Sequence, residues 1–164
     1  MAARISSSYD LILRDLKATE ALGARLAAVL ESGDVVGLKG PLGSGKTTLA
    51  RAVIAALGGT EEVPSPTFTL VQIYELARGP LWHVDLYRLE RAEDALELGL
   101  EEALAEAIVL IEWPEKLGPL LPADRLEITL SPGGAEEARR VRLTAFGRWR
   151  DRLKGLTASA EASP

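Results

Sequence analysis

The sequence predicts an α/β fold in which a mostly parallel central sheet is flanked by helices and carries antiparallel strands at its edges. Helical and strand-like segments are mixed along the whole chain. The segment 107–111 is entirely apolar and the segment 34–39 is apolar between its charged ends, as is typical of strands buried on both faces of a parallel sheet. Two further pairs of strand-like segments are separated by short Gly- and Pro-containing turns, which favours antiparallel pairing.

The first third of the chain alternates strand and helix patterns. Asp15 can cap a helix whose leucines at 22, 26 and 30 share one face, and Gly33 ends it. A second helix begins after a Gly-rich turn and closes at Gly58-Gly59. The predicted elements here are a strand over 9–14, a helix over 16–31, a strand over 34–39 and a helix over 46–57.

The remainder of the chain contains more strands. Pro64 and Pro66 indicate a loop, and Arg78-Gly79-Pro80 indicates a turn between two strands. A second turn, Ser-Pro-Gly-Gly at 131–134, separates another strand pair. The predicted elements are strands over 68–76 and 81–87, an acidic helix over 92–106, strands over 107–111, 125–130 and 139–146, and a helix over 147–156.

Length and composition bound the class of protein. The 164 residues fit a single domain over residues 1–156, with a small polar tail, 157–164, that we expect to be disordered. The chain has no cysteine and one histidine, which excludes disulfides, thiolate zinc sites, cysteine nucleophiles and multi-histidine metal sites. A net charge of −5 argues against a strongly basic nucleic-acid binder. Neither a secretory signal nor a membrane-spanning run is evident, so we expect a cytoplasmic protein.

The sharpest motif is a glycine-rich turn between a predicted strand and a predicted helix. Gly40-Pro-Leu-Gly-Ser-Gly45-Lys46-Thr47 matches the pattern G-x-x-x-x-G-K-[ST] throughout. Such glycines let successive backbone amides point at phosphate oxygens, and the helix that follows directs its positive end at the same anion. Lys46 can reach the β- and γ-phosphates, and the Thr47 hydroxyl can bind Mg²⁺. The motif therefore predicts a P-loop NTPase-like fold.

A phosphate-binding turn of this kind needs an acidic partner for the metal ion. Asp85 and Glu112 both end apolar strands, which places each carboxylate at the edge of the sheet where ligands bind. The strand before Glu112 is the more apolar and is therefore expected to be central. On pattern alone Glu112 is favoured over Asp85 as the metal ligand, and a helix cap or a salt bridge is the alternative for either side chain.

Several segments in addition to the glycine-rich turn resemble one family, the bacterial TsaE (YjeE) ATPases of tRNA threonylcarbamoyladenosine biosynthesis. The similarity extends over roughly residues 10 to 145. The matching segments are Leu42-Gly-Ser-Gly-Lys-Thr-Thr48, Ser65-Pro-Thr-Phe-Thr-Leu-Val71 with Tyr74, His83-Val-Asp-Leu-Tyr-Arg88, Glu97-Leu-Gly99 and Ile111-Glu-Trp-Pro114.

The resemblance implies an ATPase that uses ATP and Mg²⁺. It implies that the chain works with two partners, TsaB-like and TsaD-like proteins, which carry out threonylcarbamoyl transfer to the adenosine beside the anticodon, and that it meets tRNA through that complex and no membrane. Hydrolysis is expected to be weak in the isolated chain. The segments 65–71 and 85–88 are similar to the two switch regions of GTPases.

The resemblance also assigns roles to individual positions. Lys46, Asp85 and Glu112 are implied in catalysis, with Asp85 needed for hydrolysis, and Thr47 and Glu112 are implied as ligands of Mg²⁺. Contacts to the base and ribose are implied near the first helix and the last strand. The implied nucleotide-binding residues are Leu42, Gly43, Ser44, Gly45, Lys46, Thr47, Thr48, Leu16, Thr19 and Arg139.

Other interpretations remain open. A small-molecule P-loop kinase would need room for a lid, of which the sequence offers little. A non-hydrolysing, nucleotide-gated interaction module is the other alternative. His83 is either a catalytic base or, as the strand pattern favours, a packed or hydrogen-bonded histidine. Trp113 is either a lid or partner contact, or a packing residue. The arginine-rich segment 139–154 is either a tRNA-binding patch or a solvated face with local ion pairs.

Overall fold

The computed structural model describes residues 6–59 and 70–162. One sheet of seven strands passes through this part of the chain, in the order β1-β7-β6-β2-β5-β4-β3. The elements are β1 Ser6–Leu13, α1 Leu16–Val29, β2 Val35–Lys39, α2 Lys46–Ala56, β3 Val71–Leu76, β4 Gly79–Asp85, the 3₁₀ segment η1 Ala92–Leu98, α3 Leu100–Glu106, β5 Ile108–Glu112, η2 Pro114–Leu120, β6 Arg125–Pro132, β7 Arg139–Phe146 and α4 Trp149–Ala162.

The sheet is mixed, and its parallel part is central. The neighbouring strands β6, β2, β5 and β4 run parallel to one another. The outer strands β1, β7 and β3 each pair antiparallel with their neighbours. This arrangement agrees with the α/β prediction, including the antiparallel edges. The carboxyl ends of the four parallel strands therefore meet at one edge of the sheet.

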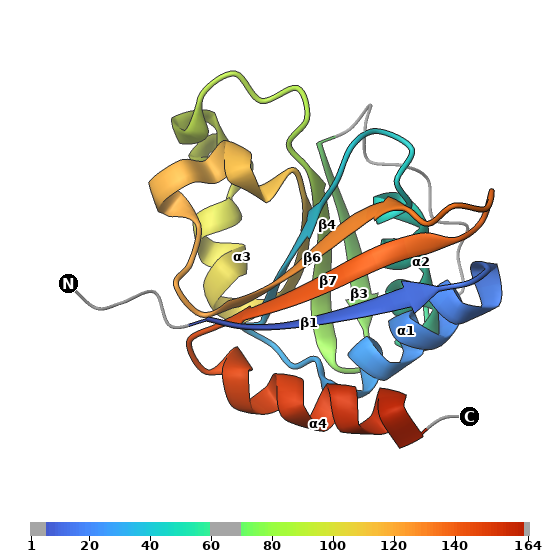
Figure 1. Ribbon diagram of the computed structural model, residues 1–164. Helices are drawn as coiled ribbons and strands as arrows, with labels where there is room; N and C mark the ends of the chain where they lie inside the picture. Colours follow the sequence, from blue (N-terminus) through green and yellow to red (C-terminus); the bar gives the residue numbers. More distant parts are fainter. Residues whose placement is uncertain (1–5, 60–69, 163–164) are drawn as a thin grey trace.

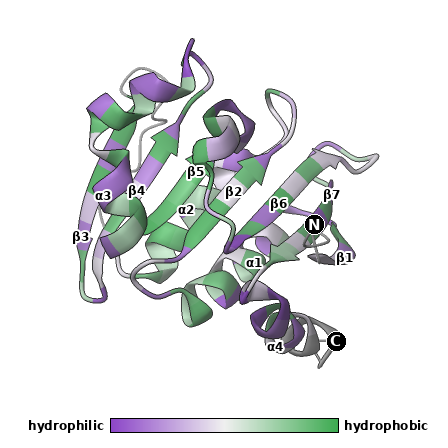
Figure 2. Cartoon of the chain, turned by 90° about the vertical axis from the view of Figure 1, so that its left-hand side faces the viewer, coloured by the Kyte–Doolittle hydropathy of each residue, from purple (hydrophilic) through white to green (hydrophobic). Residues whose placement is uncertain are grey.

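Helices cover both faces of the sheet (Figure 1). One apolar cluster joins α1, α2 and α4 to one face and contains Leu26, Leu49, Leu110 and Trp149. A second cluster joins η1, α3 and η2 to the other face and contains Leu100 and Val109. The central strand β5 is buried at every position, and Figure 2 shows it as hydrophobic, in contrast to the largely hydrophilic α4. Burial on both faces explains its unbroken apolar sequence.

Several element boundaries differ from the sequence predictions. The acidic segment is not one helix, because Gly99 takes a left-handed conformation (φ 77°) and separates η1 from α3. The turn between β3 and β4 lies at residues 77–78, so β4 begins at Gly79 and ends at Asp85. Helix α4 continues to Ala162, which corrects the predicted helix end at Leu156. The predicted Pro64–Pro66 loop and the start of the 68–76 strand lie outside the described residues.

Within the described residues, no helix combines the length and apolar character needed to cross a bilayer.

Candidate functional site

The glycine-rich turn joins the carboxyl end of β2 to the start of α2. Gly40, Gly43 and Gly45 all have positive φ values, of 142°, 79° and 104°. At Gly40 a side chain is also excluded sterically, because a Cβ would lie 2.3 Å from the carbonyl oxygen of Leu130. Gly45 is the N-cap of α2 and supplies no capping side chain. The first amides of α2 therefore remain available to a ligand at the helix N-terminus.

Lys46, the first residue of α2, folds back over this turn. Its side chain is buried, and Nζ donates hydrogen bonds to the carbonyl oxygens of Gly40 and Pro41, the latter at 3.0 Å. Nζ also lies 4.2 Å from the centre of the Trp113 ring. Burial lowers the pKa of Lys46 below the ordinary lysine value, an effect that the negative charge of Glu112 partly opposes. The ammonium is thus held close to the loop, where it can exchange backbone carbonyls for phosphate oxygens.

Two buried carboxylates lie side by side next to this lysine. The parallel register of β4 and β5 places Asp85 directly opposite Glu112 at the carboxyl edge of the sheet. The Thr47 hydroxyl lies 2.9 Å from both carboxylate oxygens of Glu112 and donates to them. Asp85 Oδ1 accepts a hydrogen bond of 2.9 Å from the backbone amide of Tyr87. The structure therefore joins Thr47 to Glu112, the pair that the sequence favoured as metal ligands, and leaves Asp85 beside them.

His83 also belongs to this site, and the structure shows it as the buried, hydrogen-bonded histidine that the strand pattern favoured over a catalytic base. The ring is fully buried in β4, and Nε2 lies 2.7 Å from Oε2 of Glu112. The two-residue spacing between His83 and Asp85 indicated that both share one face of the strand. Their sequence positions did not reveal that this face lies against Glu112, because that depends on the pairing of β4 with β5.

Trp113 covers the site on the side of Lys46. It is the one non-glycine residue with positive φ (62°) within the described parts of the chain. Its ring packs against Tyr87, with ring centres 5.0 Å apart. A left-handed conformation is costly for a bulky residue, so the surrounding contacts must hold it. Trp113 also packs against the apolar cluster on this face of the sheet, so its contacts agree with both interpretations left open by the sequence, a position over the site and simple packing.

Four further predicted nucleotide contacts gather in a separate pocket. A pocket of about 170 Å³ is lined by Leu16, Thr19, Gly45, Thr48, Leu130, Glu137 and Arg139. It lies between the start of α1, the end of the glycine-rich turn and the β6–β7 connection. Leu16, Thr19, Thr48 and Arg139 are thereby brought together, although their roles stay predictions. Leu42 does not line this pocket and is 68% exposed on the turn.

The two segments compared with switch regions are only partly described. Residues 65–69 lie outside the described part of the chain. Leu70 is described, and its carbonyl accepts a hydrogen bond of 2.9 Å from the amide of Asp85. The amide of Leu86 in turn donates to the carbonyl of Glu112 at 3.1 Å. The start of the 85–88 segment is therefore tied by its backbone to the end of β5.

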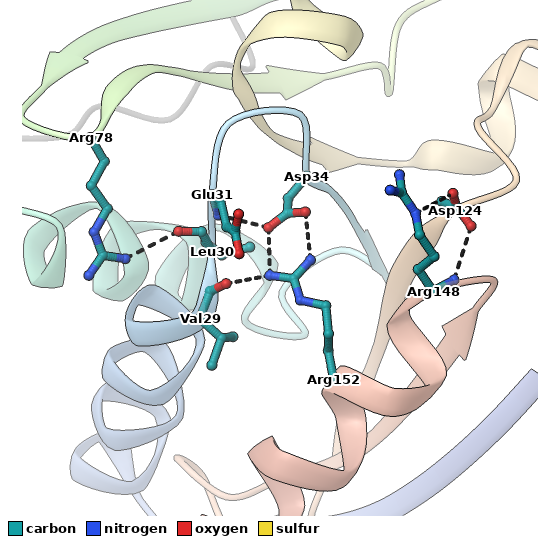
Figure 3. A network of polar contacts seen from close by, with 8 residues as sticks. All are labelled: Val29, Leu30, Glu31, Asp34, Arg78, Asp124, Arg148 and Arg152. Atoms are coloured by element: carbon teal, nitrogen blue, oxygen red, sulfur yellow. Dashed lines mark hydrogen bonds and ion pairs between the residues drawn. The ribbon is translucent and has the colours of Figure 1, made fainter.

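Several arginines of the segment 139–154 make local contacts, and Figure 3 shows those of Arg148 and Arg152. Arg152 forms a paired contact with both carboxylate oxygens of Asp34 and also donates to the carbonyl of Val29. Arg148 pairs with Asp124 at 3.0 Å, and Arg142 pairs with Asp10 at 2.8 Å. These contacts agree with the interpretation of a face with local ion pairs.

Among the described residues, no group of three or more His, Cys, Asp or Glu side chains is arranged to hold a metal ion. A Mg²⁺ ion that shares the phosphates of a nucleotide needs few protein ligands, since it keeps several waters and usually takes one or two carboxylates. The hydroxyl of Thr47 and the carboxylate of Glu112 are oxygen donors of the type that Mg²⁺ prefers. The pair therefore fits this ion.

These features define an α/β protein whose mixed sheet carries a glycine-rich strand–turn–helix at the carboxyl edge of its parallel strands. A family model described as "Threonylcarbamoyl adenosine biosynthesis protein TsaE" matches residues 13–141. The chain belongs to the TsaE family.

Individual relatives support the same conclusion. The chain is 38% identical over 130 residues to tRNA threonylcarbamoyladenosine biosynthesis protein TsaE of Bacillus subtilis, covering 79% of this chain and 80% of that protein. It is 40% identical over 147 residues to the TsaE protein of a Nostoc species, covering 87% and 89%. The crystal structure of YdiB from Bacillus subtilis superimposes with a TM-score of 0.80 at 30% identity, covering 96% of this chain and 99% of that one.

Proposed function

We propose that this chain is a Mg²⁺-dependent P-loop ATPase. With TsaB-like and TsaD-like partner proteins it supports formation of the threonylcarbamoyl modification on the tRNA adenosine next to the anticodon. The observation that carries the proposal is the contact of Thr47 with Glu112 at the N-terminus of α2, beside the buried Lys46. Membership of the TsaE family supports the biosynthetic role.

The glycine-rich turn supplies the phosphate contacts in this proposal. Its backbone amides and the uncapped first turn of α2 form a positive, concave site for the phosphate oxygens. Lys46 Nζ turns from the carbonyls of Gly40 and Pro41 toward the terminal phosphates, where its charge opposes the negative charge of the transferring group. The nucleoside would occupy the pocket next to Gly45, between Thr19 and Arg139.

Thr47 and Glu112 would hold the metal ion. When bound, Mg²⁺ neutralises charge on the phosphate oxygens of the nucleotide. Thr47 donates its hydroxyl proton to Glu112 and so keeps its oxygen lone pairs directed away from the carboxylate. The buried position of Glu112 gives the carboxylate a defined orientation and a low-dielectric environment, in which its charge acts more strongly on a cation.

Asp85 is the residue proposed to orient the attacking water. Its carboxylate is buried next to Glu112, and the Tyr87 amide fixes one of its oxygens. Positioning and electrostatic stabilisation account for most of the catalysis of phosphoryl transfer. Lys46 lies close to the two carboxylates, and a second cation for the γ-phosphate would come either from Arg88 or from a partner. If a partner supplies it, the isolated chain should hydrolyse ATP slowly and the complex should hydrolyse it faster.

The test measures ADP release by the chain alone and after addition of each partner and of tRNA. Lys46→Ala should abolish nucleotide binding. Asp85→Asn and Glu112→Gln should retain binding of ATP, measured by calorimetry, and lose hydrolysis. If the folded wild-type chain produces no heat with ATP and Mg²⁺, the proposal is wrong.

The same variants separate the alternatives. Continued tRNA modification by a complex that contains Asp85→Asn, with ATP bound and not hydrolysed, would indicate a nucleotide-gated interaction module. Transfer of the γ-phosphate to a small molecule in an acceptor screen would indicate a kinase. Either result would replace the ATPase proposal.

A further inference from the structure

A chain of three polar side chains extends from the glycine-rich turn into the apolar interior. Thr47 on α2 contacts Glu112 on β5, and Glu112 contacts His83 on β4 at 2.7 Å. His83 is the innermost member and has no solvent-exposed surface. His83 is remote from the glycine-rich turn in sequence, and the carboxylate of Glu112 connects the two.

The strand register explains how His83 reaches Glu112. Asp85 pairs with Glu112, and His83 pairs with Leu110, so His83 and Glu112 lie diagonally on neighbouring parallel strands. Neighbouring paired side chains in a sheet share a face, and Leu110 belongs to the cluster that packs against α2. The imidazole therefore lies in an apolar layer beneath the site.

The burial of this ring has a cost that packing alone does not explain. Nδ1 is buried and has no hydrogen-bond partner among the described residues. A buried polar atom without a partner is destabilising, and an apolar side chain would fill the same space without that cost. Because Nδ1 has no acceptor there, the proton of a neutral ring belongs on Nε2, where Glu112 accepts it.

We propose that His83 is a positioning residue for Glu112. Its Nε2–H group holds Oε2 of Glu112, so that the carboxylate keeps the orientation in which it receives the Thr47 hydroxyl and faces the cation. Hydrogen-bond partners of metal ligands commonly change metal affinity by about 10–100-fold when they are removed. This inference rests on the proposed function, since it assigns His83 to the Mg²⁺ site of the ATPase.

The experiment compares two uncharged amides at position 83. In His83→Gln the side-chain amide nitrogen reaches about as far as Nε2, whereas in His83→Asn it stops near the position of Nδ1. Each variant is loaded with ADP, and its affinity for Mn²⁺ is measured by electron paramagnetic resonance. The affinity for ADP without metal is measured by calorimetry. His83→Leu serves as the variant without any donor.

We expect His83→Asn and His83→Leu to bind Mn²⁺ about 10–100-fold more weakly than wild type and His83→Gln to recover most of the affinity. The affinity for metal-free ADP should stay unchanged, because the amides of the turn bind phosphate without the carboxylate. Leu81→Val is the matched control: it lies fully buried on the same strand, and it should lower the melting temperature without changing Mn²⁺ affinity.

Two results would overturn the proposal: equal Mn²⁺ affinity of His83→Asn and His83→Gln, or equal affinity of a folded His83→Leu and the wild type. If His83→Leu does not fold, the comparison of the two amide variants still tests the proposal. Failure of the proposed function can be distinguished from failure of the role proposed for His83. A wild type that binds Mn²⁺ and ADP as expected, but hydrolyses no ATP with its partners and tRNA, would refute the ATPase and leave the role of His83 supported. If wild type binds no metal with ADP, both proposals are wrong.

Discussion

The ammonium nitrogen of Lys46 lies 4.2 Å from the centre of the Trp113 ring. The backbone of Trp113 is in the left-handed region, with φ 62°, and its ring packs on Tyr87. Trp113 directly follows Glu112, and Tyr87 lies two residues after Asp85, so the aromatic pair is continuous with the two carboxylate-bearing strand ends. A change in the position of Lys46 is therefore transmitted directly to an indole ring.

Trp113 should report nucleotide binding by its fluorescence. A cation–π contact of this kind contributes about 0.5–2 kcal/mol, and the emission of the indole changes when the ammonium moves toward a phosphate. We expect addition of ATP with Mg²⁺ to change the emission of wild type and of Trp82→Phe. The change should be absent in Trp113→Phe. A signal that persists in Trp113→Phe would contradict the arrangement.

Nucleotide binding should weaken as pH rises. The decrease should begin at a lower pH than it would with a lysine of ordinary pKa. Burial lowers the pKa of Lys46, and the phosphates require its protonated form. Affinity for ADP, measured by calorimetry over a pH range of about 8 to 10, should fall as Lys46 loses its proton. Lys46→Arg keeps its charge and should flatten this dependence, whereas the exposed Lys154→Arg should follow the wild type.

The lowered pKa of Lys46 also determines the direction in which the free energy of unfolding changes with pH. The unfolded chain, with the higher pKa at Lys46, binds more protons than the folded chain between the two pKa values. The contribution of Lys46 to the free energy of unfolding therefore becomes more favourable as pH rises through that interval. In Lys46→Met this contribution disappears. Urea unfolding of both proteins at a series of alkaline pH values measures the difference, and parallel curves would contradict it.

Two glycines near α4 should respond to alanine in opposite directions. Gly147 has φ 64°, and a Cβ there would lie 1.7 Å from Oδ1 of Asp124. Gly147→Ala should destabilise the fold by at least about 1–2 kcal/mol, the cost of the left-handed conformation alone. Gly155 lies within α4, and a Cβ added there would meet no atom within 4 Å. Gly155→Ala should stabilise by about 0.5–1 kcal/mol, and thermal unfolding measures both.

Arg152 should be more important for stability than Arg148. Arg152 is 26% exposed and bonds to Asp34 and the end of α1, whereas the Arg148 side chain is 87% exposed. Arg152→Ala removes the cationic partner of the partly buried Asp34 carboxylate, which then keeps the Glu31 amide as a donor, and it removes the donor to the Val29 carbonyl, at a cost of about 1–3 kcal/mol. The ion pair of Arg148 is at the surface, so its loss should cost at most about 1 kcal/mol. Equal effects in urea unfolding would contradict this difference.

The local pairing of these arginines also bears on tRNA. Phosphate contacts reduce binding affinity as salt increases, with a slope set by the number of phosphates neutralised. Because Arg148 already pairs with Asp124 and Arg150 already donates to the carbonyl of Gly147, we expect replacement of Arg148 and Arg150 by Ala to leave the salt slope of tRNA binding by the complex unchanged. A slope that decreases by about one for each arginine would instead indicate a tRNA-binding patch.

The local geometry that depends on adjacent residues was predictable from the sequence. The glycine-rich turn, Lys46 and Thr47 lie within one short segment whose spacing determines where amides, ammonium and hydroxyl point. Glu112 was favoured because its strand is the most apolar, and such a strand is buried on both faces at the centre of the sheet. Local pattern was sufficient in each case because the relevant geometry is made within one strand or one turn.

Relationships between distant segments were decided by the tertiary structure alone. Asp85 lies opposite Glu112 and His83 reaches Glu112 because of the register of β4 on β5, which no local pattern specifies. Thr19 and Arg139 share a pocket because β7 folds back next to the start of α1. Strand register is set by the simultaneous packing of two helical layers on the sheet. The free energy of this packing is a sum over many segments, so no single segment of the chain specifies the register.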